Sequence, residues 1–184
     1  TPERDDERGL FATLRECAVA EIATSPDEAR HVLPLALPKA TIRTAGRVND
    51  LAFAPHRPVI AFGTGRRKAA VWNFQTGEVE QIVSGFAHAV GLIAFAPDGK
   101  LLCAERAKTT AEPCEIYLIH DVRRLPVGRH DGSVTVLKML DAERLLSAGR
   151  DEKAAMWHVG ERRQISAQGL TVWPRAGTVS PDAH

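Results

Sequence analysis

The chain has 184 residues, and its 24 Lys and Arg side chains nearly balance 23 Asp and Glu side chains, which gives a formal net charge of +1. This balance excludes a strongly basic chain that binds nucleic acid or anionic membranes through overall charge, and we expect neither partner. The 3 cysteines form no Cys-x-x-Cys pair and no apolar run approaches the ~20 residues that cross a bilayer, which favours a cytoplasmic protein without disulfides or a zinc cluster.

The first part of the chain divides into two segments. Residues 1–16 are rich in charge and place apolar residues at helical spacing, which predicts a short amphipathic helix. Residues 17–44 contain short apolar runs and resemble a shortened, degenerate copy of the repeat that follows them. The chain starts at Thr1 rather than at Met, and we expect it to be a segment of a longer protein.

A repeat occupies the central part of the chain. Val48, Val90 and Val134 recur at intervals of 42 and 44 residues. The runs Arg-Arg-Lys-Ala-Ala-Val-Trp, at 66–72, and Asp-Glu-Lys-Ala-Ala-Met-Trp, at 151–157, are each followed by Gly-Glu and then by Gln-Ile. A period of ~40–45 residues is typical of a four-stranded propeller blade.

Within each copy, short apolar runs alternate with Gly, Pro and Asp residues at which the chain has to turn. The pattern predicts three clear strands and a weaker fourth strand in each copy. We therefore predict an all-β chain of four-stranded antiparallel sheets, with copies at 45–84, 85–127 and 128–168. Residues 169–184 are expected to begin a further strand and to end in a tail.

The third copy resembles the WD-repeat β-propeller family. Gly128-Arg129-His130 occupies the place of the family's Gly-His, and a Ser, an Asp and a Trp follow at the family's spacing. The resemblance implies a buried, hydrogen-bonded tetrad in which an imidazole and turn amides satisfy the carboxylate. By position, its members are His130, Ser147, Asp151 and Trp157.

The other copies depart from this pattern. Arg66 takes the place of the tetrad Asp in the first copy, and Tyr117 takes the place of the Trp in the second copy. Closed propellers use ~4–8 blades, because closure protects the edges of the strands. Three copies therefore imply either part of a larger propeller or a ring that is completed by association.

Three features of the sequence resemble reactive sites. His130, Ser147 and Asp151 are the residue types of a hydrolase triad, but the resemblance assigns them to the buried scaffold. The Gly-rich run at 63–68 lacks the Gly-Lys-Ser ending of a phosphate-binding loop, and no His is paired at a zinc-site spacing. We therefore expect no catalysis, no cofactor and no metal.

The resemblance implies a rigid platform that presents loops to a partner protein or peptide. In the family, contact positions flank the start of the inner strand and precede the tetrad Asp. Here those positions are Arg47, Asn49, Ala89, Gly91, Ser133, Thr135 and Arg150. The two arginines favour an acidic partner. Two alternatives stay open: a regulatory sensor propeller in a larger effector protein, and an enzyme with a site in the central channel. The Arg- and Ala-rich composition favours a bacterial source, in which such effector proteins are common.

Overall fold

Short apolar runs with closely spaced turn residues divide the chain into antiparallel strands. The computed structural model describes residues 42–44, 46–109 and 112–177, and every regular element in these ranges is a β-strand. These residues belong to the compact unit Ala40–His184. The predicted helix at 1–16 and most of the degenerate copy at 17–44 lie outside the described residues. Nowhere in the described ranges is there a helix that could span a membrane.

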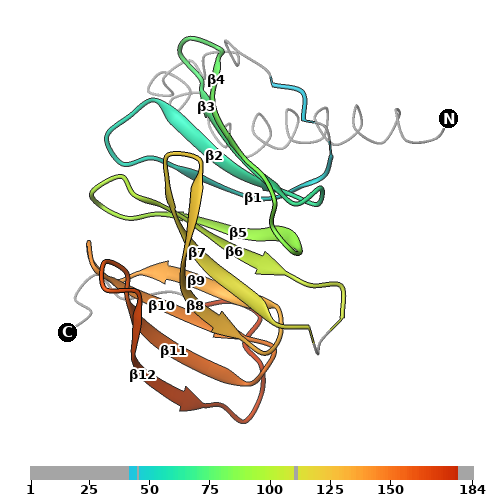
Figure 1. Cartoon of the computed structure of the whole chain (residues 1–184), viewed down its shortest axis with the longest axis vertical. Coiled ribbons are helices and arrows are strands. Elements are labelled where there is room, and N and C mark those ends of the chain that lie inside the picture. Colours follow the sequence, from blue (N-terminus) through green and yellow to red (C-terminus); the bar gives the residue numbers. More distant parts are fainter. Residues whose placement is uncertain (1–41, 45, 110–111, 178–184) are drawn as a thin grey trace, which may run out of the picture. The chain divides into compact units, whose positions relative to one another are not determined.

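The strands form three four-stranded sheets, and each sheet consists of consecutive strands (Figure 1). The first sheet contains β1 (Val48–Phe53), β2 (Val59–Thr64), β3 (Lys68–Asn73) and β4 (Val79–Val83). The second contains β5 (Ala89–Phe95), β6 (Leu101–Arg106), β7 (Cys114–His120) and β8 (Arg123–His130). The third contains β9 (Val134–Met139), β10 (Arg144–Gly149), β11 (Lys153–His158) and β12 (Arg163–Gly169). All pairings are antiparallel, which confirms the predicted all-β fold of four-stranded sheets.

Two boundaries differ from those of the sequence repeat. Residues 128–130, which begin the third copy in the sequence, end β8 and pair within the second sheet. The further strand expected from residue 169 onward is wrong for the described residues, because Gly169 ends β12 and 170–177 form no strand. Leu170 instead donates its N–H to Glu152 O at 2.7 Å, and Pro174 has no N–H for a strand ladder.

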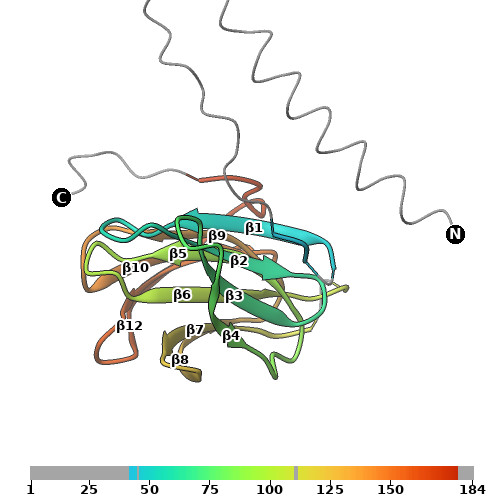
Figure 2. The ribbon, with the colours of Figure 1, turned by 90° about the horizontal axis from the view of Figure 1, so that it is seen from above.

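The sheets pack face to face in chain order, with β1 next to β5 and β5 next to β9. Figure 2 shows these three strands on one side and β4 and β8 on the other. In β6, side chains alternate between two cores: Leu101 and Cys103 pack toward the first sheet, and Leu102 and Ala104 pack toward the third. Both faces of the second sheet are therefore buried, which explains its nearly continuous apolar runs.

The first sheet exposes apolar residues on the face turned away from the second sheet. Phe62, Ala70 and Trp72 form a small cluster there, whereas the residues between them pack against the second sheet. Leu51 pairs with Phe62 and is 54% exposed, and Phe53 is 64% exposed. In a propeller, such a face packs against a preceding blade. Large apolar patches on a protein surface favour association.

We predict that this apolar face drives self-association. The chain should show concentration-dependent association in sedimentation velocity, because packing this face against another sheet removes its apolar surface from water. The double substitution Leu51→Lys and Phe53→Lys should shift the chain toward a monomer. Val122→Lys is the matched control, since Val122 is 64% exposed in the turn between β7 and β8. A wild-type chain that stays monodisperse and monomeric would contradict the prediction.

Candidate functional site

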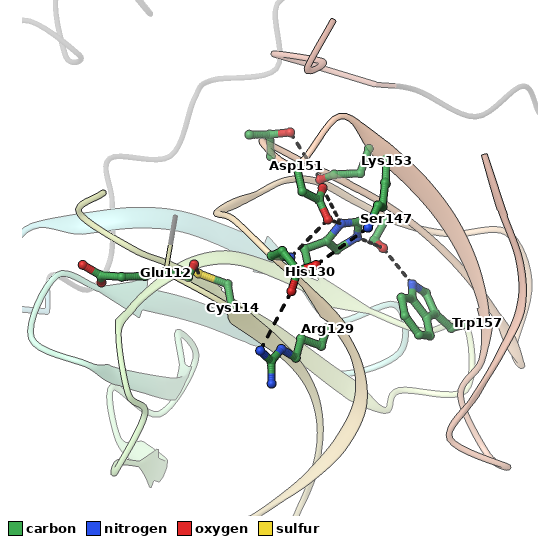
Figure 3. Close-up of polar contacts among 11 residues, drawn as sticks. Glu112, Cys114, Arg129, His130, Ser147, Asp151, Lys153 and Trp157 are labelled. Carbon is green, nitrogen blue, oxygen red and sulfur yellow. Dashed lines mark hydrogen bonds and ion pairs between the residues drawn. The ribbon is translucent and has the colours of Figure 1, made fainter. Parts of the chain in front are cut away.

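The four tetrad residues meet at the boundary between the second and third sheets (Figure 3). His130 is the last residue of β8, which belongs to the second sheet. Ser147 lies on β10 and Trp157 on β11, both in the third sheet, and Asp151 lies in the turn between these two strands. The tetrad therefore joins two sheets rather than stabilising one sheet alone.

The tetrad forms one continuous chain of hydrogen bonds. His130 Nδ1 lies 2.9 Å from Asp151 Oδ1. An ionised carboxylate can only accept, so Nδ1 donates to Asp151, and Nε2 lies 2.8 Å from the Ser147 hydroxyl oxygen. Ser147 Oγ in turn accepts from Trp157 Nε1 at 2.7 Å. The backbone N–H of Asp131 also donates to Asp151 Oδ2 at 3.1 Å, which fixes the loop that leads into the third sheet.

Close packing seals this network from solvent. Ser147 is 0% exposed and His130 is 2% exposed. A Cβ atom at Gly149 would lie 2.7 Å from Asp151 Oδ1 and 2.8 Å from His130 Nδ1, and a Cβ atom at Gly128 would lie 2.7 Å from the Trp157 ring. The Ser147 hydroxyl is therefore buried within the hydrogen-bonded network.

A different residue supplies the carboxylate at the boundary between the first and second sheets. Glu105, near the end of β6, is 0% exposed. Its Oε1 accepts from the backbone N–H groups of Ala87 at 2.7 Å and His88 at 3.3 Å, and its Oε2 accepts from Glu115 N at 3.1 Å. Ala87 precedes β5 as Asp131 precedes β9, so Glu105 holds the connecting loop as Asp151 does at the next boundary.

The other tetrad positions are apolar at this first boundary. Phe86 lies four residues before Val90, as His130 lies four residues before Val134, and its ring meets Tyr117 edge to face at a centroid distance of 5.6 Å. Tyr117 directly follows the register shift between β7 and β8, as Trp157 follows the one between β11 and β12. Cys103 pairs with Ile93 as Ser147 pairs with Leu137, and burial raises the pKa of the Cys103 thiol, which stays neutral.

Sequence reasoning missed Glu105 because the tetrad pattern has no acid at that position. The sequence nevertheless contained a signal. Glu105 directly follows the apolar run Leu101–Ala104, and a charged side chain that continues a buried strand is either buried with it or lies at the edge of the sheet. A buried carboxylate requires hydrogen-bond donors, and unpaired loop amides are the nearest ones. The second boundary therefore uses a tetrad, and the first uses a single carboxylate with an aromatic pair.

A depression of about 520 Å³ lies at the end of the molecule where the inner strands begin, and all three sheets line it. Each inner strand has a bulge at its start, and the bulged residues Asn49, Gly91 and Thr135 all line the depression. The remaining wall comes from segment 170–177, which contributes Trp173 and Arg175 and appears in red in Figure 2 on the side of β1 and β9. Bulges frequently redirect side chains beside functional sites.

Several predicted contact residues line this depression but use their polar atoms inside the fold. Asn49 Nδ2 donates to Val90 O at 2.9 Å and ties the first sheet to the second. Ser133 is 2% exposed, and its hydroxyl donates to Ala107 O at 3.2 Å. The Thr135 hydroxyl donates to Ala148 O at 3.2 Å. These three residues therefore shape the depression, and direct contact between any of them and a partner stays a prediction.

The two predicted arginines differ in position. Arg150 lines the depression, and its backbone N–H donates to Ser133 O at 2.9 Å. Arg47 is exposed and lies outside the lining residues, although its carbonyl accepts from Gly65 N at 2.9 Å. Gly91 lines the depression and Ala89 does not. A Cβ at Gly91 would lie 2.5 Å from Arg106 Cβ, so this glycine allows Arg106 to lie over the start of β5.

Two further arginines and a tryptophan complete the lining, and sequence reasoning missed them. Arg106 ends β6, and Trp173 and Arg175 follow β12. The Arg150 and Arg175 guanidinium carbons lie 5.0 and 5.3 Å from the Trp173 ring centroid. Asp50 is the one acid in the lining, and its Oδ2 accepts from Ile93 N at 2.8 Å. The depression is therefore positively charged.

The described residues contain no group of three or more His, Cys, Asp or Glu side chains that could hold a metal ion. Burial raises the pKa of the Cys114 thiol to about 11, and its Sγ donates to Glu112 O at 3.7 Å. A thiol of this kind is a poor nucleophile and a poor metal ligand at neutral pH.

The tetrad geometry predicts a large stability effect for Asp151→Ala. Removal of this carboxylate leaves His130 Nδ1–H and Asp131 N–H without their acceptor, which should cost ~1–3 kcal/mol of the free energy of unfolding. Asp98→Ala is the control, because Asp98 lies in an exposed turn and contacts Lys100. Urea unfolding of both variants measures the difference, and equal losses would count against the tetrad.

The structure makes a parallel prediction for the first boundary. Glu105→Ala leaves the Ala87 and Glu115 amides without an acceptor and should also cost ~1–3 kcal/mol, whereas Glu105→Gln retains one oxygen and should cost less. Glu115→Ala controls for the loss of a partly buried acid on the neighbouring strand. Amide hydrogen exchange at Ala87 should accelerate in the Glu105→Ala variant. Unchanged exchange there would rule out the proposed role of Glu105.

Comparison with known proteins gives several relatives at low identity. The chain is 29% identical over 152 residues to nuclear distribution protein PAC1 of Arthroderma otae, a match that covers 74% of this chain and 32% of that protein. The same protein of Coccidioides posadasii is 27% identical over 168 residues, covering 80% and 35%. The chain thus spans about a third of the length of these curated relatives. They are fungal, whereas the composition favoured a bacterial source. No family model matches the chain.

Solved structures establish the fold. The RRP9 WD40 repeats superpose with a TM-score of 0.64 at 18% identity, covering 73% of this chain and 42% of that chain. The computationally designed Ika4 protein superposes with a TM-score of 0.65 at 16% identity, covering 78% and 86%. These likenesses agree with the three four-stranded antiparallel sheets. The described part of the chain is therefore a run of three four-stranded β-propeller blades, similar in fold to the blades of WD40 repeats.

Proposed function

We propose that the chain is a protein-interaction scaffold that binds its partner in the depression at the starts of β1, β5 and β9. The observation that supports this proposal is the joint lining of the depression by three sheets, with a bulged residue from each inner strand. Because the bulged strands belong to hydrogen-bonded sheets, the surface is ordered before a partner arrives. Binding to such a surface costs little conformational entropy.

Charge indicates the kind of partner. Arg106, Arg150 and Arg175 line the depression, and the single lining acid, Asp50, already accepts a backbone N–H. A partner with carboxylates or other anions on its contact surface would be attracted over distance and held in register. An acidic protein or peptide is therefore the partner that this surface fits best.

The open apolar face of the first sheet supports a second role, as part of a longer propeller within a larger protein. The chain spans about a third of its curated relatives, and Leu51 and Phe53 are exposed where a preceding blade would pack. In that arrangement the depression would be one sector of a larger binding face. A regulatory propeller in a multidomain effector is the corresponding alternative function.

We predict that charge reversal in the depression weakens partner binding without unfolding the chain. Arg106→Glu combined with Arg150→Glu should reduce the association rate and the recovery of partners in a pull-down, since both residues line the depression. Thermal melts should change little. Association with the wild-type chain should slow as the ionic strength rises past ~0.15 M, where screening shortens electrostatic reach to ~8 Å.

Two variants serve as controls for this prediction. Arg123→Glu reverses a charge at the start of β8, outside the lining residues, and should leave binding unchanged. Arg47→Glu reverses a charge near β1 but outside the depression and should have an intermediate effect through long-range attraction. Full retention of every partner by the Arg106 and Arg150 double variant would show that another surface binds the partners.

A further inference from the structure

The three arginines in the depression have no carboxylate partner within the described residues. Ion pairs in the described ranges involve other cations, such as Arg129 and Lys153, which both approach Asp131. Arg106, Arg150 and Arg175 form none of these pairs, although all three line one depression. Three arginines with a single acid, Asp50, in the same lining leave an excess of positive charge, and an added anion would offset it.

Arg150 carries an unpaired donor beside this surface. Its Nε is a buried donor with no hydrogen-bond partner, and its backbone is held by the bond from its N–H to Ser133 O. Buried donors in folded proteins are paired in the great majority of cases. The Arg150 guanidinium also lies over the Trp173 ring, 5.0 Å from its centroid. Contact with a flat ring orients the guanidinium plane and leaves its in-plane N–H groups free for an anion.

The number of donors and charges selects among anions. A carboxylate has two oxygens and one charge, which one guanidinium can satisfy in a bidentate pair. A phosphomonoester has three terminal oxygens and a charge of about −1.5 to −2 at neutral pH. Three guanidinium groups with a single, already bonded acid nearby match the second ion better. A volume of about 520 Å³ also leaves room for the residues that flank a phosphorylated side chain.

We propose that this depression binds a phosphorylated side chain of a partner peptide through Arg106, Arg150 and Arg175, with Trp173 orienting the Arg150 and Arg175 guanidinium groups. This inference rests on the proposed function and specifies its ligand. A peptide is a better fit than a nucleic acid, because the whole chain has a formal charge of only +1 and the depression offers one aromatic ring for stacking. The half-buried Leu92 in the lining provides an apolar contact for a neighbouring peptide residue.

The test uses the full chain and three fluorescein-labelled degenerate heptapeptide libraries that differ only at the central residue, which is phosphoserine, serine or glutamate. Fluorescence anisotropy should show binding of the phosphoserine library about tenfold or more tighter than the glutamate library, because additional charge-assisted hydrogen bonds form. The serine library should bind more weakly than either. The Nε–Hε signal of Arg150 in an NMR correlation spectrum should shift on addition of O-phosphoserine.

Matched variants connect the affinity to the geometry. Arg150→Lys keeps the charge but removes the planar donor set, and it should weaken phosphoserine binding several-fold without a change in melting temperature. Trp173→Leu should weaken binding because the Arg150 and Arg175 guanidinium groups lose their stacking surface. Arg123→Gln, outside the lining residues, should bind like the wild-type chain.

Three outcomes would overturn the inference. Equal binding of the glutamate and phosphoserine libraries would identify a carboxylate site, and partner recovery in the pull-down would then still support the scaffold function. No binding of the phosphoserine library at ~1 mM chain, where even weak complexes of −4 kcal/mol form, would also overturn it. Tighter binding of vesicles that contain phosphorylated lipids, or of single-stranded RNA, through the same arginines would assign the site to another partner class.

Discussion

At both boundaries between sheets, a carboxylate accepts hydrogen bonds from backbone amides of the loop that connects the two sheets. Asp151 accepts from Asp131 N, and Glu105 accepts from Ala87 N and His88 N. These loops are short and lead directly into the next inner strand, so their amides do not pair in a strand ladder, and the carboxylates supply the acceptors instead. The packing of each sheet on the next depends on these hydrogen bonds. They also fix where β5 and β9 begin.

The binding face follows from the same arrangement. Because the connecting loops are held, β5 and β9 start at fixed places, and the bulges at Gly91 and Thr135 present their residues at the same end of the sheets as Asn49 of β1. Ser133 and Asn49 use their polar atoms to link neighbouring segments, so the arginines supply most of the free donors on this face. The scaffold residues and the contact residues are therefore neighbours in sequence but have separate roles.

Much of the fold could be predicted from local signals: the Ala-Ala-x-Trp run of the first and third blades, the turn residues and a period near 43 residues are visible without any long-range information. The tetrad positions could be predicted by resemblance, and the structure brings His130, Ser147, Asp151 and Trp157 together. Glu105 could not be found this way, since its role depends on which loop amides face it across two sheets. Trp173 and Arg175 could not be placed either, because segment 170–177 leaves the repeat and its path is set by tertiary contacts such as the close approach of Gly177 to Val136.

Gly149 and Glu105 occupy equivalent positions: Gly149 pairs with Val134 of β9, and Glu105 pairs with Val90 of β5. The surroundings of one position do not suit the residue at the other. At Gly149 a single added carbon would collide with His130 and Asp151, whereas at Glu105 a whole side chain fits because Phe86 replaces the imidazole. Single substitutions cannot convert the tetrad arrangement into the Glu105 arrangement or the reverse. Gly149→Glu would bury a second carboxylate beside Asp151, and an Asp introduced beside Glu105 would bury the same pair of like charges. Each arrangement therefore fits only its own neighbouring residues, and exchange of the two between boundaries would require several simultaneous substitutions.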